Sequence, residues 1–444
     1  MPYIPHTDDE RKEMLSSMGR GSIDDLFDYI PRSLAPKSFN LPKGMPEYDV
    51  LRRLQALAAK NATGLVCFVG GGFYDHYVPA AADAVISRSE FYTAYTPYQP
   101  EISQGTLQAI YEYQTAICRL TSMEVSNASL YDGGTALYEA SMMAVRITGR
   151  RKIVVDQGVS PIYRVMLDSY TRNLNLEFEE IPVQGGVTDR KKLKAAINSE
   201  TAAVVLQNPN FFGCVDDFTD VAAMAHAAGA VVVCSVYPIS LGLLKPPGEM
   251  DADIVTGEGQ SLGLPLSFGG PYLGFIAARM QHVRKMPGRI AGATTDAQNR
   301  RGFVLTLQTR EQHIRREKAT SNICSNEALC ALGALAYMCL IGKEGLRDVA
   351  RVCAEKAAYT KKRLAQIPGV SIKYPAPTFN EFAIELPRDA GAVIGDLIEK
   401  GFAAGFPLGH YYEGMEKSML IAVTEKRTKE EIGCLAEALE EALL

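Results

Sequence analysis

Tryptophan is absent from the 444 residues, and histidine occurs only six times. The histidines show no His-Glu-x-x-His or other clustered spacing, so the sequence predicts no metal site. The nine cysteines include no Cys-x-x-Cys pair, and most lie in apolar runs, where a thiol packs as a small hydrophobe. No Gly-x-Ser-x-Gly turn is present to display a serine nucleophile. These absences argue against metal-dependent and serine-dependent hydrolysis.

An excess of positive charge is also lacking. Lys and Arg total 46 against 51 Asp and Glu, a formal net charge of −5, which argues against nucleic acid as a main partner. The amino-terminal segment carries Asp8, Asp9, Glu10 and Lys12 where a signal peptide would need an apolar run. No apolar stretch is expected to span a bilayer. We therefore expect a cytoplasmic protein with no membrane partner.

Residues 90–105 form the most informative segment that is present, Glu-Phe-Tyr-Thr-Ala-Tyr-Thr-Pro-Tyr-Gln-Pro-Glu-Ile-Ser-Gln-Gly. Pro97 and Pro100 exclude a regular helix, and the apolar residues follow neither a helical nor a strand period. Three tyrosines supply contact area and hydroxyl groups at a low cost in side-chain entropy. Composition alone leaves two interpretations open, a segment that lines a site and an ordinary structured loop.

The order of apolar segments indicates an α/β fold. Short apolar runs predict buried strands at 65–69, 153–155, 202–206, 230–234, 254–256 and 273–277. Helical patterns at 135–147 and 219–228 lie between them, so the strands should form a mostly parallel sheet.

Different patterns flank this region. Near the start, Thr7 and Glu10 form a possible capping box, and the apolar residues of 23–30 share one helical face. Helices at 326–340 and 347–365 lead to strands at 370–374, 379–386 and 419–424, and a last helix begins at a Thr428/Glu431 capping box. We therefore predict three parts: a helical segment 1–63, a large α/β domain 64–344 and a small α+β domain 345–444.

Several ordered motifs resemble one enzyme family. Residues 95–105 resemble the Tyr-Thr-Pro-Tyr-Gln-Pro-Glu-x-Ser-Gln-Gly signature of glycine decarboxylase, the P-protein of the glycine cleavage system. The similarity extends to residues 127–136, 245–249, 268–271 and 318–324, and it matches the amino-terminal half of the long P-protein. In some organisms that half is a separate subunit, called subunit 1 or alpha. The resemblance implies a pyridoxal-phosphate fold of type I.

That fold implies a phosphate cradle at a helix amino terminus. Gly133, Gly134 and Thr135 have the position and residue types of such a cradle, which would be vestigial here. Asp132 departs from the pattern, because a carboxylate repels a phosphate. The alternative interpretation of this segment is an ordinary helix N-cap and turn.

Two further features of the fold are missing. The strand at 230–234 is followed by Ser235-Val236-Tyr237, with no carboxylate to keep a pyridine nitrogen protonated. Residues 257–263, where the Schiff-base lysine is expected, contain no lysine. Lys245 lies nearby, but Lys-Pro-Pro-Gly-Glu indicates a surface turn. The chain therefore has the expected scaffold without the residues of its chemistry.

The resemblance implies that a beta subunit, subunit 2, holds the pyridoxal phosphate, and that none is covalently bound to this chain. The implied assembly is an α2β2 heterotetramer that decarboxylates glycine and transfers the aminomethyl group to the lipoyl arm of H-protein. This chain alone should then be inactive. Two alternatives remain open: a self-sufficient pyridoxal-phosphate enzyme that uses Lys245, and a non-catalytic regulatory paralogue.

Under the leading interpretation, this chain completes the shared active site. The candidate residues carry hydroxyl, amide or carboxylate groups, and they are Tyr95, Thr96, Tyr98, Gln99, Glu101, Ser103, Gln104 and Asn322. Glu101 could relay a proton or cap backbone N–H groups, and Ser103 could instead be the N-cap of the next helix. The basic run 313–318 could attract an acidic H-protein or be a solvated helix face.

Overall fold

The computed structural model describes residues 5–34, 36, 38 and 40–444. The chain divides into two compact units, Met1–Thr63 and Gly64–Leu444. The first unit contains α1 (Asp8–Ser17), a short 3-10 helix η1 (Asp24–Phe27) and α2 (Glu47–Ala58). The capping box predicted at Thr7 and Glu10 is confirmed, with both reciprocal hydrogen bonds present. Leu26 and Phe27 lie in the single turn of η1, whereas Ile23 and Ile30 lie outside it, so the shared helical face predicted at 23–30 does not form.

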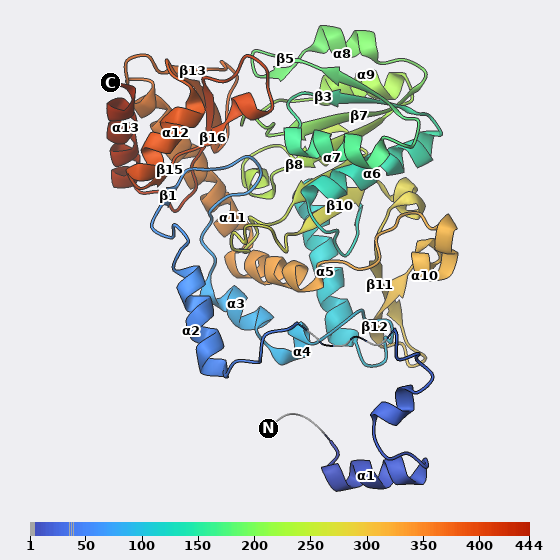
Figure 1. Cartoon of the computed structure of the whole chain (residues 1–444). Coiled ribbons are helices and arrows are strands. Elements are labelled where there is room, and N and C mark those ends of the chain that lie inside the picture. The colour runs from blue at the N-terminus through green and yellow to red at the C-terminus, as the bar shows by residue number, and fades with distance from the viewer. Residues whose placement is uncertain (1–4, 35, 37, 39) are drawn as a thin grey trace. The chain divides into compact units, whose positions relative to one another are not determined.

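A seven-stranded sheet is the centre of the second unit (Figure 1). Its strands, in spatial order, are β2 (Val125–Ser126), β10 (Gly274–Ala278), β9 (Ile254–Glu258), β8 (Val231–Val236), β7 (Thr201–Asn208), β3 (Lys152–Asp156) and β4 (Glu177–Ile181). The strands from β9 to β4 are parallel, and only β10 and β2 are antiparallel to their neighbours. The mostly parallel α/β sheet predicted from the sequence is confirmed.

Alternate residues of each central strand enter two separate cores, because successive side chains point to opposite faces. On one face, Val155, Val205 and Val233 pack with α6 (Gly133–Thr148) and α7 (Pro161–Thr171). On the other face, Val204 and Val232 pack with side chains of four helices, α5 (Gln104–Thr121), α8 (Arg190–Ala196), α9 (Thr219–Ala227) and α11 (Ala328–Leu364). Burial on both faces explains why these strands are continuous apolar runs.

Helix α11 is interrupted at Gly342, whose φ of 60° and ψ of −172° are not helical. Of the described helices, α11 alone is long and apolar enough, by length and composition, to cross a membrane, which differs from our expectation. The interruption divides it into two shorter helices, and the first packs against α3 (Ala80–Ile86) and α5. The predicted domain boundary at 344/345 falls within α11 and stays a prediction.

The carboxy-terminal region adds a second, four-stranded sheet with its own core. The strand order is β13 (Ser371–Ile372), β14 (Glu381–Glu385), β17 (Ser418–Ala422) and β16 (Phe406–Pro407). Helices α12 (Ala390–Glu399) and α13 (Lys429–Leu443) pack on it, and α13 begins at the predicted Thr428/Glu431 capping box. The predicted strand at 65–69 is shorter, β1 (Val66–Cys67), and it pairs with β15 (Phe402–Ala403) rather than with the central sheet.

The remaining elements are short. They are α4 (Ser89–Tyr92), the hairpins β5 (Val183–Gln184)–β6 (Val187–Thr188) and β11 (Ile290–Thr295)–β12 (Arg301–Thr306), α10 (Gln312–Arg315), and the 3-10 helices η2 (Pro238–Gly242), η3 (Pro247–Met250), η4 (Met280–Lys285), η5 (Gln308–Arg310), η6 (Arg316–Lys318) and η7 (Leu408–His410).

Candidate functional site

The carboxyl ends of the parallel strands form the edge where α/β sheets ordinarily bind ligands. In this chain the edge is filled by buried side chains, chiefly Tyr74, Tyr163, Tyr237 and Glu258. The cavity left among them measures about 20 Å³, room for about one water molecule. This space is too small for an organic cofactor.

The amino terminus of α6 is the place where the sequence suggested a phosphate cradle. Asp132 is its N-cap, and its carboxylate accepts hydrogen bonds from the Thr135 N–H at 2.8 Å and the Thr135 hydroxyl at 2.9 Å. The N–H of Gly133 donates to Glu258 Oε2 at 2.9 Å. Carboxylates of the chain itself therefore occupy the donors that a phosphate would need. The N-cap interpretation of Asp132 is confirmed.

Gly133 and Gly134 are required by packing at this helix terminus. A Cβ on Gly133 would lie 2.5 Å from the Tyr163 hydroxyl, and one on Gly134 would lie 2.5 Å from Met166 Sδ. Glycine permits α7 to lie directly against the start of α6. The space beside these two glycines is therefore occupied by Tyr163 and Met166 of the chain itself.

Glu258 ends strand β9 and is almost completely buried. Burial raises its pKa to about 7, although the N–H groups of Leu273, Gly133 and Gln260 all donate to its carboxylate and oppose that rise. Residues 257–263 contain no lysine, and Tyr237 follows β8 where a carboxylate would hold a pyridine nitrogen. The residues at this edge therefore do not fit pyridoxal phosphate.

A second buried carboxylate, Glu381, fixes the segment after β1 to this edge. It accepts hydrogen bonds from the Gly71 N–H at 2.7 Å and from the Tyr74 hydroxyl at 3.0 Å. Complete burial raises its pKa to about 8 despite these two donors. Gly70 leaves no room for a side chain, since a Cβ there would lie 2.0 Å from Glu381 Oε1.

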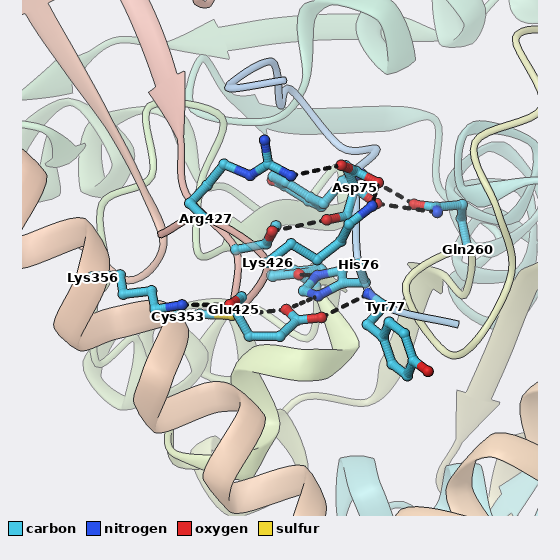
Figure 2. A network of polar contacts seen from close by, with 12 residues as sticks. Asp75, His76, Tyr77, Gln260, Cys353, Lys356, Glu425, Lys426 and Arg427 are labelled. Atoms are coloured by element: carbon cyan, nitrogen blue, oxygen red, sulfur yellow. Dashed lines mark hydrogen bonds and ion pairs between the residues drawn. The ribbon is translucent and has the colours of Figure 1, made fainter. Parts of the chain in front are cut away.

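The same segment continues into the polar network of Figure 2. His76 Nδ1 lies 2.6 Å from Glu425 Oε2, and His76 Nε2 contacts the Tyr237 hydroxyl. Glu425 also accepts from the Tyr77 N–H, and its carbonyl accepts from Lys356. Burial acts to raise the pKa of Glu425, but the contacts with His76 and Tyr77 outweigh it and lower that pKa to about 2. The network ties the large sheet to the carboxy-terminal region.

Next to the His76–Glu425 pair, Asp75 forms ion pairs with the two residues that follow Glu425 in the chain. Its carboxylate lies 2.6 Å from Lys426 Nζ and 3.2 Å from Arg427 Nη2 (Figure 2). Cys353 Sγ lies 3.5 Å from Glu425 Oε2, so a thiol, an imidazole and a carboxylate meet within 4.8 Å. The carboxylate is already shared between His76 and Tyr77, which makes this cluster a structural connection.

Residues 94–103 connect α4 to α5 and carry most of the candidate residues. Gln104, the first residue of α5, donates to the carbonyls of Pro100 and Phe303 and accepts from the Phe303 N–H. Its amide therefore fastens the loop to strand β12. Gln104 is placed as a structural residue rather than one that faces a ligand.

Arg289 brings three of the sequence motifs together. Its Nη2 lies 3.2 Å from the Tyr98 hydroxyl and 2.7 Å from the Cys324 carbonyl, and its Nη1 lies 3.2 Å from Asn326 Oδ1. Asn326 in turn donates to Ser129 Oγ. Residues 95–105 and 318–324 thus contact one buried guanidinium directly, and residues 127–136 are joined to it through Asn326. Sequence patterns do not predict a role for this arginine, because no local pattern marks a contact between distant segments.

The other candidate residues form no such contacts. Within the described part of the chain, no hydrogen bond involves the side chains of Tyr95, Thr96, Gln99, Glu101, Ser103 or Asn322. Ser103 stands at the N-cap of α5 without a side-chain cap bond, and Glu101 caps no N–H group. Tyr95 is 76% exposed and Ile102 is 81% exposed. These side chains have free polar groups at the surface.

Lys245 lies neither at the buried edge of the central sheet nor among the residues around Arg289. Its ammonium lies 3.4 Å from Asp217 Oδ2 and 3.3 Å from Thr219 Oγ1, at the start of α9. The side chain is partly exposed on the turn before η3, as the prolines predicted.

Known proteins resemble the chain along its whole length. The family model described as "Glycine cleavage system P-protein" matches residues 1–439. The "Probable glycine dehydrogenase (decarboxylating) subunit 1" of Geotalea daltonii is 57% identical over 443 residues, 100% of each chain. The protein of that name from Maridesulfovibrio salexigens is 57% identical over 99% of each chain.

Solved structures agree with the sequence comparison. A crystal structure of glycine decarboxylase (P-protein) of the glycine cleavage system, in inhibitor-bound form, matches with a TM-score of 0.94 and 46% identity over 100% of each chain. A Lactobacillus brevis glutamate decarboxylase matches with a TM-score of 0.69 and 13% identity over 95% of this chain and 96% of its own, a likeness of fold alone. The predicted fold class, that of the type I pyridoxal-phosphate enzymes, is confirmed. The chain belongs to the glycine cleavage system P-protein family.

Proposed function

We propose that this chain is the alpha subunit, subunit 1, of a two-subunit glycine decarboxylase. A beta subunit holds the pyridoxal phosphate, and the two chains form an α2β2 heterotetramer in the cytoplasm. The names of the relatives from G. daltonii and M. salexigens support this assignment, since both are called subunit 1 of a glycine dehydrogenase (decarboxylating). The chain alone is then inactive.

The observation that carries the proposal is the filled edge of the central sheet. Glu258 and Asp132 take the N–H donors at the start of α6, and residues 257–263 supply no lysine. A chain that keeps the scaffold of a cofactor-dependent enzyme without a usable cofactor site needs a second chain for the chemistry.

The surface of residues 95–103 is the contribution of this chain to the shared active site. In the proposed reaction glycine loses its carboxylate as CO2, and its aminomethyl group passes to the oxidised lipoyl arm of H-protein. Tyr95, Gln99 and Glu101 present free hydroxyl, amide and carboxylate groups that can orient the glycine carboxylate or the lipoyl disulfide. Arg289 and Gln104 hold the loop in place behind them.

Visible absorption spectra test the proposal. Pyridoxal phosphate is added to this chain alone, to the beta subunit alone and to the mixture, and glycine–bicarbonate exchange is measured in parallel. We expect a cofactor band that borohydride fixes only to the beta subunit, and exchange only in the mixture. A borohydride-fixed cofactor on the isolated alpha chain would refute the proposal.

Two variants separate the remaining alternatives. If the chain were self-sufficient, the isolated chain would display a cofactor band, and Lys245→Ala would abolish it. We expect no such band in the isolated chain and no effect of Lys245→Ala on exchange by the complex. If the chain were a regulatory paralogue, changes at Tyr95 or Glu101 would leave exchange by the complex intact. We expect those changes to reduce exchange.

A further inference from the structure

A cavity of about 300 Å³ lies beside the turns that follow the β11–β12 hairpin. It is separate from the filled sheet edge and from the loop 94–103. Its lining residues are mainly cations and hydroxyls: Arg284, Leu307, Thr309, Arg310, Arg315, Lys318 and Thr320. No carboxylate is among them. We call this the basic cavity.

Arg310 forms the base of the basic cavity and is only 9% exposed. Its Nε donates to the Leu307 carbonyl at 3.0 Å, and its Nη2 donates to the Gly288 carbonyl at 2.9 Å. Nη1 is buried and has no hydrogen-bond partner within the described part of the chain. A guanidinium stays charged in a protein interior, so Arg310 brings an incompletely satisfied positive charge to the wall of the cavity.

The other cations come from separate short elements around the opening. Arg315 of α10 is oriented by a hydrogen bond from its Nε to the Thr309 carbonyl at 3.1 Å. Arg284 of η4 and Lys318 of η6 form no ion pair with any described residue. The three cations therefore gather around one opening from separate elements, and none of them is held by a described carboxylate.

The neighbouring carboxylates are directed elsewhere. Glu311 lies 3.8 Å from Arg289 and 3.7 Å from His313, within the Arg289 cluster. Glu139 accepts a hydrogen bond from the Ser321 hydroxyl at 2.6 Å. Neither lines the basic cavity, but Glu311 follows Arg310 and its charge attracts that guanidinium. The lining cations without a described ion pair are therefore Arg284, Arg315 and Lys318.

From these features we propose that the basic cavity binds a phosphate group, either as the free ion or as part of a small phosphorylated molecule. Arginine matches the oxygens of phosphate with paired N–H groups, and lysine adds a mobile positive charge. The Thr309 and Thr320 hydroxyls can donate to the remaining oxygens. The proposal does not depend on the proposed decarboxylase function.

Calorimetric titration of the full-length chain with inorganic phosphate at pH 7.5 and low ionic strength tests this proposal. We expect saturable binding of one ion per chain, weakened by added salt because the opening of the cavity is exposed. Pyridoxine 5′-phosphate and pyridoxine form the second arm, since neither carries an aldehyde that would react with lysine. Free phosphate and pyridoxine phosphate both supply the phosphate group that the cavity is proposed to bind. Tighter binding of pyridoxine phosphate than of free phosphate assigns the site to a phosphorylated molecule.

Charge-matched variants locate the site. Arg315→Gln and Lys318→Gln, both at the exposed opening, should each weaken phosphate binding about tenfold. Lys285→Gln and Arg316→Gln remove the same charge from adjacent positions outside the lining and should change it less than twofold. These exposed positions avoid the risk that replacement of buried Arg310 unfolds the chain.

Three outcomes would overturn the proposal. The first is the absence of saturable phosphate binding by the folded wild-type chain. The second is an equal loss in the lining variants and the adjacent variants, which would indicate a diffuse basic surface. The third is equal competition by an oligoglutamate peptide of the same total charge, which would assign the surface to an acidic protein partner.

Discussion

Arg289 Nη2 lies 3.2 Å from the hydroxyl of Tyr98, a residue 191 positions away in the chain. The guanidinium carbon also lies 5.5 Å from the centre of the Tyr98 ring. The buried guanidinium of Arg289 therefore fixes the loop 94–103 on its inner side, while the side chains of Tyr95 and Glu101 are exposed to solvent. A loop that is already ordered loses little entropy when a partner binds.

Replacement of Arg289 by lysine should destabilise the second unit. Lysine keeps the charge but cannot reach Tyr98, Cys324 and Asn326 together, which leaves buried polar groups unsatisfied. We expect the free energy of unfolding to fall by about 2–4 kcal/mol in urea titrations. Arg300→Lys, on an exposed pair with Asp296, is the control and should cost less than about 0.5 kcal/mol. Similar losses for both variants would contradict the role of Arg289.

Substitutions in the exposed part of the loop should affect activity and leave folding unchanged. Tyr95→Phe removes a hydroxyl and Glu101→Gln removes a negative charge, and neither group forms a hydrogen bond within the described chain. We expect unfolding midpoints within error of wild type and at least about a tenfold loss of glycine–bicarbonate exchange in the reconstituted complex. Tyr92→Phe, an exposed change in α4 outside the signature segment, is the control. Full activity in both test variants would place the shared site elsewhere.

Glu381 should make stability fall as the pH rises. Its pKa in the folded chain, about 8, lies above the ordinary value near 4.5, so folding favours its protonated form. Its stabilising contribution is complete below about pH 4.5 and is lost as the pH rises through about 8. Glu381→Gln mimics the protonated side chain and should remove this dependence.

Urea titrations of wild type and Glu381→Gln at several pH values between 5 and 8.5 measure the effect. The stability of wild type relative to the variant should decrease by up to about 1.4 kcal/mol per pH unit in this interval. Glu258, whose pKa is raised to about 7, remains in both proteins and cancels from the comparison. A constant difference across the interval would show that Glu381 is ionised throughout.

Gly70 should tolerate no side chain. A Cβ there would lie 2.0 Å from Glu381 Oε1 and 2.6 Å from Ala422 Cβ, both held in the interior. We expect Gly70→Ala to lower the free energy of unfolding by about 1–3 kcal/mol. Gly64→Ala is the matched control, since no atom lies within 4 Å of its added methyl group. Thermal or urea unfolding of the two variants gives the comparison, and equal stability would contradict the packing described.

Local patterns in the sequence predicted the parts of this fold that depend on neighbouring residues. The Thr7/Glu10 and Thr428/Glu431 capping boxes, the apolar strands β3, β7, β8 and β9, and helices α6 and α9 all follow from spacing and residue type. Strand β4 was missed because Glu177, Glu179 and Glu180 give an edge strand a polar sequence. Pairing partners need information from outside the segment, and the strand near residue 66 was assigned to the wrong sheet for that reason.

The residues of the candidate site also divide into those that local residue types predict and those that depend on contacts between distant segments. The missing lysine at 257–263 and the N-cap role of Asp132 could be read from residue types at known positions. The contacts of Arg289, Glu381 and Glu425 join segments hundreds of positions apart, and each residue by itself resembles any surface charge. Gln104 is predicted to contribute to the shared site together with the rest of its motif, whereas its amide binds the backbone of Phe303.

The pairing of β1 with β15 sets an order of events during synthesis. Val66 is among the first residues of the second unit to leave the ribosome, and its partner Phe402 follows 402 − 66 = 336 residues later. At about 5–20 residues per second, the amino-terminal strand waits tens of seconds for its partner. The segment up to His76 also lacks two of its partners until Glu381 and Glu425 have been made. A nascent chain that stalls before Phe402 is made leaves the edge of β1 unpaired, and an unpaired strand edge favours association with other chains.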